Sequence, residues 1–115
     1  MSASRHVLVV EDDRTIRSLV ALWLPDDCEH HDAGSLADAR ALLAARTFDL
    51  VVLDLMLPDG EGDLLLSDIP RGTPIIAMSG SQRMIAEPGR VVSYLPKPFD
   101  PQMLTTLARQ ALRKR

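Results

Sequence analysis

Charged and hydroxyl side chains follow the aliphatic runs of this sequence, at the point where each run ends. In chain order, the run ends carry Glu11-Asp12-Asp13, Asp54, Ser79-Gly80 and Pro96-Lys97-Pro98-Phe99. If the runs are parallel strands, their carboxyl ends share one edge of a sheet, where ligands bind in such folds. Two carboxylates about 4 Å apart repel by roughly 4 kcal/mol at an effective dielectric constant near 20, so their clustering implies a bound cation. Hard oxygen ligands without a thiolate or an imidazole favour magnesium over zinc or copper.

Each of these residues also has a simpler structural interpretation. A single aspartate after a strand is often the N-cap of the next helix, and this suits Asp13. Asp54 is followed by Leu55-Met56-Leu57-Pro58, a predicted loop with no helix to cap, so an acid there needs a chemical reason. Ser79 alone is equally consistent with a turn residue, and Lys97 alone with a surface amine. Their joint occurrence at the run ends favours a site.

Short apolar segments alternate with longer segments of helical spacing, which predicts an α/β domain with a parallel sheet. The predicted strands are 7–10, 28–33, 50–53, 74–78 and 91–95. Segments 7–10 and 50–53 are continuous aliphatic runs, so we expect central strands covered on both faces. Segment 28–33 is polar, so we expect it at an edge.

Three segments predict well-formed helices, and two predict only short ones. The first three run from Asp13 to Leu24, from Ser35 to about Arg46, and from an Asp100 N-cap almost to the C-terminus. The first of these has an apolar stripe that we expect in the core, made of Ile16, Leu19, Val20, Trp23 and Leu24. Segment 62–69 is brief and segment 81–89 contains a proline, so any helix there is short or irregular.

The composition limits both the architecture and the function. The length of 115 residues and the hydrophobic content of 46% suit one core, so we expect a single domain over 1–115. A net charge of −3 gives no electrostatic excess for nucleic acid. Cys28 is the only cysteine and no apolar stretch suits a signal peptide or a membrane span, so we expect a cytoplasmic protein. His6, His30 and His31 show no metal-ligand spacing, and we expect ordinary surface or strand histidines.

Four motifs, at residues 7–13, 49–60, 74–80 and 94–99, together resemble the response-regulator receiver domain, the CheY-type module of two-component signalling. The resemblance extends from about Arg5 to the C-terminus. It implies a flavodoxin-like, doubly wound five-stranded parallel sheet in the order 2-1-3-4-5, flanked by helices. Because segments 62–69 and 81–89 are brief, we expect the third and fourth helices of this fold to be shortened.

The resemblance also implies a metal-dependent phosphoacceptor. Asp54 matches the aspartate that takes a phosphoryl group from the phosphohistidine of a histidine kinase. Glu11 and Asp12 match the acidic pair that organises Mg²⁺ (or Mn²⁺), with Asp12 the more direct ligand and Asp54 a further one. Met56 matches the position whose backbone carbonyl also reaches the metal.

Four further residues match positions of the family around the phosphoacceptor and its switch. Ser79 matches the hydroxyl that hydrogen-bonds the phosphoryl group, and Lys97 matches the lysine that pairs with it. Tyr94 matches the aromatic residue whose rotamer follows activation. The Lys97-Pro98 bond matches a cis peptide that aims the lysine inward.

Two kinds of function remain open at this point. The first is a phosphoacceptor, a monomer or weak dimer, that is served by a histidine kinase or a histidine phosphotransfer protein. It acts on a still unknown downstream protein, without direct contact with nucleic acid or membrane. The second is a receiver-like binding module that signals without phosphate cycling. We do not expect a turnover enzyme, because an aspartyl-intermediate phosphatase needs a second aspartate where Met56 stands.

Overall fold

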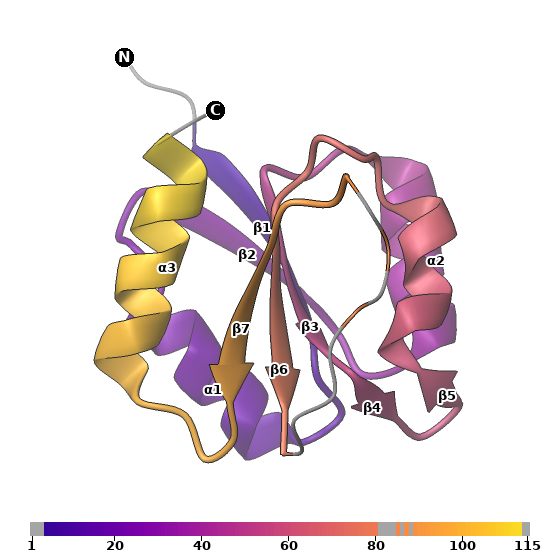
Figure 1. Cartoon of the computed structure of the whole chain (residues 1–115), viewed down its shortest axis with the longest axis horizontal. Helices are drawn as coiled ribbons and strands as arrows, with labels where there is room; N and C mark the ends of the chain where they lie inside the picture. Colours follow the sequence, from indigo (N-terminus) through magenta and orange to yellow (C-terminus); the bar gives the residue numbers. More distant parts are fainter. Residues whose placement is uncertain (1–3, 81–84, 86, 88, 114–115) are drawn as a thin grey trace.

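A five-stranded parallel sheet in the order β2-β1-β3-β6-β7 forms the centre of the protein (Figure 1). The structure is a computed structural model that describes residues 4–80, 85, 87 and 89–113. The five strands are β1 (Arg5–Val10), β2 (Cys28–Ala33), β3 (Leu50–Asp54), β6 (Ile75–Ser79) and β7 (Val92–Pro96). Counted along the chain, this is the predicted order 2-1-3-4-5, with the polar strand β2 at an edge as expected.

Helices cover both faces of the sheet, α1 and α3 on one face and α2 with a 3-10 helix, η1, on the other (Figure 1). Their bounds are α1 (Arg14–Trp23), α2 (Leu36–Ala45), η1 (Gly62–Asp68) and α3 (Pro101–Arg113). The predicted N-caps are present, since Asp13, Ser35 and Asp100 each accept a backbone N–H in the first turn of their helix. These caps satisfy N–H groups that the helix itself leaves unpaired.

The alternation of side chains along β1 explains why its sequence is continuously aliphatic. Val7 and Val9 pack against α1 and α3, whereas Leu8 and Val10 pack on the side of α2. All residues of β3 are buried as well. Because both faces of these strands are covered by helices, neither face tolerates polar residues. Polar side chains are therefore confined to the ends of the strands.

The bounds of β1 and β7 differ from the sequence prediction by one or two residues, and two further differences lie after β3 and at the start of β6. The predicted loop after β3 contains a short antiparallel pair, β4 (Met56–Leu57) with β5 (Gly60–Glu61). Strand β6 begins at Ile75 rather than Pro74, because Pro74 has no backbone N–H for the ladder, although its carbonyl accepts from the N–H of Val51. Neither difference moves the residues at the strand ends.

The prediction that the whole apolar stripe of α1 lies in the core is wrong for two residues. Val20 and Leu24 are buried, and Ile16 packs beside them. Leu19 and Trp23 each remain 37% exposed. The buried residues follow each other at intervals of four, and Leu19 and Trp23 lie on the flank of this row, beyond the contact with the sheet. Phe99 is partly buried against the same cluster.

The short third helix is confirmed, and η1 is a 3-10 helix that ends just before Pro70. The fourth helix was expected, if present, within segment 81–89, and most of this segment lies outside the described residues. The chain continues from there into β7, which pairs with β6. The fold therefore places the ends of β1, β3, β6 and β7 at one edge.

Candidate functional site

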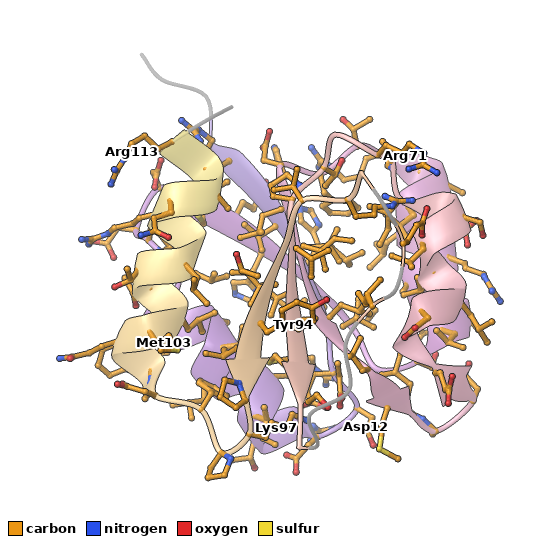
Figure 2. All side chains as sticks on the ribbon, viewed as in Figure 1. Asp12, Arg71, Tyr94, Lys97, Met103 and Arg113 are labelled. Atoms are coloured by element: carbon orange, nitrogen blue, oxygen red, sulfur yellow. The ribbon has the colours of Figure 1, made fainter. Side chains whose placement is uncertain are left out.

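Four of the predicted residues lie at the carboxyl edge of the sheet. Glu11 and Asp12 directly follow β1, and Asp54 is the last residue of β3. Lys97 directly follows β7, and its Nζ atom lies 2.7 Å from Oε1 of Glu11 and 3.0 Å from Oδ2 of Asp54. Figure 2 shows Lys97 and Asp12 at the same end of the molecule, where the strand arrows point. One ammonium group therefore bridges two carboxylates from separate strands.

Burial distinguishes the three acids. Glu11 has no exposed surface and Asp54 is nearly as buried, whereas Asp12 is exposed. Buried charges need charged or hydrogen-bonding partners, because they have lost their contact with water. Lys97 supplies that compensation for Glu11 and Asp54. Asp12 remains accessible to a ligand that arrives from solvent.

Burial and a neighbouring carboxylate change the protonation of Glu11. Burial and the hydrogen-bonded neighbour Asp54 raise the pKa of Glu11 from 4.5 to about 7, against the opposing effect of Lys97. Burial alone lowers the pKa of Lys97, but its bonds to Glu11 and Asp54 outweigh this effect and the pKa is raised overall. At neutral pH Lys97 is therefore charged, and Glu11 gains and loses its proton close to pH 7.

The other carboxylate oxygen of Asp54 is held by the chain that follows it. Its Oδ1 atom accepts the backbone N–H of Met56 at 2.9 Å, while Oδ2 faces Lys97. This bond fixes the orientation of the carboxylate toward the edge of the sheet. The backbone carbonyl of Met56, predicted to reach a metal, stays a prediction.

Gly62, which no sequence motif pointed to, packs directly against the backbone of the site. A Cβ atom at this position would lie 2.4 Å from the carbonyl oxygen of Asp54 and 3.1 Å from Cα of Leu55. The N–H of Gly62 also donates to the carbonyl of Leu55 at 3.0 Å. Only glycine allows this close approach. The sequence shows a glycine at position 62, but it does not show that this glycine lies against the carbonyl of Asp54.

Two further supporting residues were also missed. Arg17 on α1 donates from Nη1 to the backbone carbonyl of Glu11 at 3.0 Å, next to the acidic pair. Asp59 accepts the backbone N–H groups of Leu36 and Ala37 at the start of α2, and these bonds lower the pKa of Asp59. The loop after Asp54 is thereby tied to a helix on the same face. An acid is required at position 59 because of its contact with the start of α2, and the sequence around Asp59 does not reveal that contact.

Ser79 lies on β6, the strand next to β3, and Tyr94 lies on β7, the edge strand beyond β6. Ser79 is the last residue of β6 and is buried, and its carbonyl accepts the backbone N–H of Lys97 at 2.8 Å. The hydroxyl of Tyr94 accepts the backbone N–H of Ile85 at 3.0 Å. Figure 2 shows Tyr94 midway along the sheet, away from the end that carries Lys97. The Lys97-Pro98 peptide bond is cis.

The acidic residues fit a hard divalent cation. Glu11, Asp12 and Asp54 each offer a carboxylate oxygen, and these three oxygens lie within 4.8 Å of one another. Magnesium prefers carboxylate oxygens and keeps several waters, and the exposed Asp12 leaves the open side that this coordination requires. The donor set therefore suits Mg²⁺, and these three residues would hold it.

A doubly wound sheet with buried acids and a lysine at its carboxyl edge defines a receiver-type signalling domain. Residues 7–109 match the family model described as the response regulator receiver domain. The chain therefore belongs to the receiver domain family of response regulators, as the motifs indicated.

Relatives found by sequence agree with this family. The chain is 36% identical to the protein PetR of Rhodobacter capsulatus, a match that covers 99% of this chain and 52% of PetR. It is 34% identical to the KDP operon transcriptional regulatory protein KdpE of Escherichia coli, over 95% of this chain and 52% of that protein. The chain thus spans about half the length of these relatives.

Solved structures agree with the fold. The signal receiver domain of an HD domain-containing protein from Pseudomonas fluorescens has a TM-score of 0.85 at 30% identity, covering 99% of this chain and 90% of that one. A CheY-like receiver domain protein from Methanospirillum hungatei has a TM-score of 0.85 at 24% identity, covering 96% and 95%. No helix among the described residues combines the length and apolar character needed to cross a bilayer.

Proposed function

We propose that Asp54 accepts a phosphoryl group from a phosphohistidine donor in a Mg²⁺-dependent reaction. The observation that carries this proposal is the Nζ atom of Lys97, which bridges Glu11 and Asp54 at the edge where the strands end. Phosphoryl transfer asks a protein mainly for a nucleophile, its positioning and charge neutralisation. The arrangement of Asp54, its Met56 hydrogen bond and Lys97 supplies these three requirements.

The transfer of the phosphoryl group needs no co-reactant other than the phosphohistidine donor and a proton from solvent. An oxygen of Asp54 forms a P–O bond as the P–N bond of the donor breaks, and the donor imidazole leaves with the electron pair and takes up a proton. Lys97 is placed to turn from the Asp54 carboxylate to the new phosphoryl oxygens as a point charge. Mn²⁺ or Mg²⁺, when bound, neutralises charge on the phosphoryl oxygens.

We further propose that phosphorylation shifts Ser79 and Tyr94. A phosphoryl group adds a charge near −2 at the edge, and Ser79 is the nearest hydroxyl on the neighbouring strand to bond it. Tyr94 must then exchange its bond to Ile85 for another arrangement. A complete reversal of populations from 1:99 to 99:1 needs roughly 5.5 kcal/mol, within reach of a few charge-assisted hydrogen bonds.

The expected partners follow from this chemistry. A histidine kinase or a histidine phosphotransfer protein supplies the phosphoryl group, and the readout is a contact with a downstream protein. The net charge of −3 supports a protein contact rather than a direct one with nucleic acid. We propose that the chain acts in the cytoplasm as a phosphoacceptor, with no substrate turned over, as a monomer or weak dimer.

Incubation with acetyl phosphate tests the proposal. We expect the wild type to gain one phosphoryl group in the presence of Mg²⁺, as measured by intact mass. The wild type in EDTA and the Asp54→Asn variant should gain none. Asp26→Asn, an exposed loop aspartate, is the matched control and should be labelled like the wild type. NMR signals of the Tyr94 ring in the labelled sample report the switch.

Each other outcome has a defined meaning. Labelling that survives Asp54→Asn would show another nucleophile. A folded wild type that takes no phosphoryl group with Mg²⁺ would favour the receiver-like binding module without phosphate cycling. Labelling with an unchanged Tyr94 ring would retain the phosphoacceptor and exclude the proposed switch.

A further inference from the structure

Two histidines and a glutamate meet at the amino end of the sheet, on strands β1 and β2. The Nδ1 atom of His6 lies 2.9 Å from Oε2 of Glu29 and 3.1 Å from Nε2 of His31. The Nε2 atom of His31 lies 3.9 Å from the same glutamate oxygen. Three atoms that can each donate a lone pair therefore converge on one point. The expectation of ordinary surface or strand histidines did not include this group, because its ligands come from two strands and no spacing along the chain reveals it.

The strand register explains why these side chains meet. His6 of β1 is directly opposite Glu29 of β2, and His31 follows Glu29 by two positions. Side chains two positions apart lie on the same face of a sheet, and directly opposite residues share that face as well. The three side chains thus form a triangle across a single strand pair. His30, between Glu29 and His31, points to the other face.

Contacts with the rest of the fold hold the backbone of His6 and the ring of His31 in place. The N–H of His6 donates to Oδ2 of Asp49 at 2.8 Å, and the carbonyl of His6 accepts the N–H of Asp49 at 2.7 Å. The ring of His31 packs edge-on against the buried ring of Phe48, with 5.4 Å between the centroids. A ligand would therefore find two of the three groups already positioned.

The distances fit a tetrahedral metal ion. Bonds of about 2.0–2.1 Å in a tetrahedral site place neighbouring ligand atoms roughly 3.3 Å apart. The three observed separations, 2.9, 3.1 and 3.9 Å, bracket this value. Glu29 is exposed, which leaves the remaining coordination position open to solvent.

We propose that His6, Glu29 and His31 form a binding site for a divalent transition-metal ion of the zinc class. Imidazole nitrogens select such ions, whereas the all-oxygen acidic site at the other edge suits magnesium. The two sites are distinct, because β1 rises about 3.3 Å per residue and separates His6 from Glu11 by roughly 16 Å. The inference does not depend on phosphorylation of Asp54.

Zinc titration of the untagged chain by calorimetry tests this site. We expect one Zn²⁺ to bind, also in Asp54→Asn, and the affinity to fall at least about tenfold in His6→Gln and in His31→Gln. His30→Gln is the matched control on the same strand, since His30 pairs with Asp32 on the opposite face. It should keep the wild-type affinity within about twofold.

The proposal is overturned if folded wild type binds no Zn²⁺ at millimolar concentration, or if the His6→Gln/His31→Gln double variant binds as tightly as the wild type. Circular dichroism checks that each variant is folded. If a variant does not fold, nitrogen NMR of the wild-type histidines decides, since Zn²⁺ should shift the signals of His6 and His31 and leave His30 unchanged. Shifts at His30 alone, or at no histidine, would contradict the site.

Discussion

The two ends of strand β1 carry two groups of titratable residues that differ in how far they are buried. At the carboxyl end, Glu11 is buried and lies against Asp54 and Lys97 from other strands. At the amino end, His6 meets Glu29 of the neighbouring edge strand, and Glu29 is exposed. The first group is enclosed by the central strands and their loops, whereas the second is open to solvent.

Enclosure decides how strongly the charges depend on one another. Away from water, the energy of each charge depends on its protein partners, because the local dielectric constant is low. This explains why the pKa of Glu11 rises to about 7 beside Asp54. Changes at the enclosed end should therefore affect folding and protonation more strongly than changes at the open end.

The largest expected effect is the pH dependence of stability that Glu11 causes. Its pKa is raised from 4.5 to about 7 in the folded chain, so the folded state keeps a proton that the unfolded state releases between these values. The contribution of Glu11 is complete below pH 4.5 and is lost as the pH rises to 7. The raised pKa of Lys97 lies far above this range.

We therefore expect Glu11→Gln to gain stability relative to the wild type as the pH rises from 4.5 to 7, by about 3 kcal/mol. Urea unfolding of both proteins in EDTA across this range measures the difference. A difference that stays flat, or that falls with pH, would mean that Glu11 ionises normally in the folded chain.

The next largest effect concerns the packing around Asp54. In Gly62→Ala the new methyl group would overlap the carbonyl of Asp54, and the backbone must shift. We expect the free energy of unfolding to fall by about 2 kcal/mol. Gly72→Ala is the control, because a Cβ atom there has no neighbour within 4 Å. Equal stability of the two variants would show that the loop after Asp54 adapts freely.

The smallest expected effect is the stabilisation by Mg²⁺, which should depend on the carboxyl end of β1 and not on its amino end. Mg²⁺ at about five times its dissociation constant should raise the free energy of unfolding by about 1 kcal/mol at pH 7.5. Asp12→Asn should lose most of this increment, because Asp12 is the exposed acid of the enclosed site. His31→Gln should keep it. If His31→Gln instead loses the stabilisation by Mg²⁺, the magnesium ion binds at the amino end of the sheet and the proposed site at the carboxyl end is wrong.

Residue types at strand ends predicted most of the enclosed site. Asp54 ends the buried strand β3 and Lys97 directly follows β7, and the carboxyl ends of parallel strands share one edge, so their meeting was foreseeable. The N-cap role of Asp13 was predicted for the same local reason, since its hydrogen bonds span only two or three residues. The exposure of Trp23 was not predicted, because helical spacing identifies an apolar stripe but not the width of the surface that covers it.

The amino-acid sequence by itself determined the fold class, the edge at which the acids gather and the family, because periodicity and strand-end chemistry are local properties of the chain. Only the tertiary structure decided that Gly62 must lack a side chain and that His6 meets Glu29 and His31. These relationships join residues that are distant in the chain, and they depend on backbone approach and strand register. Such geometry exists only once the strands are paired.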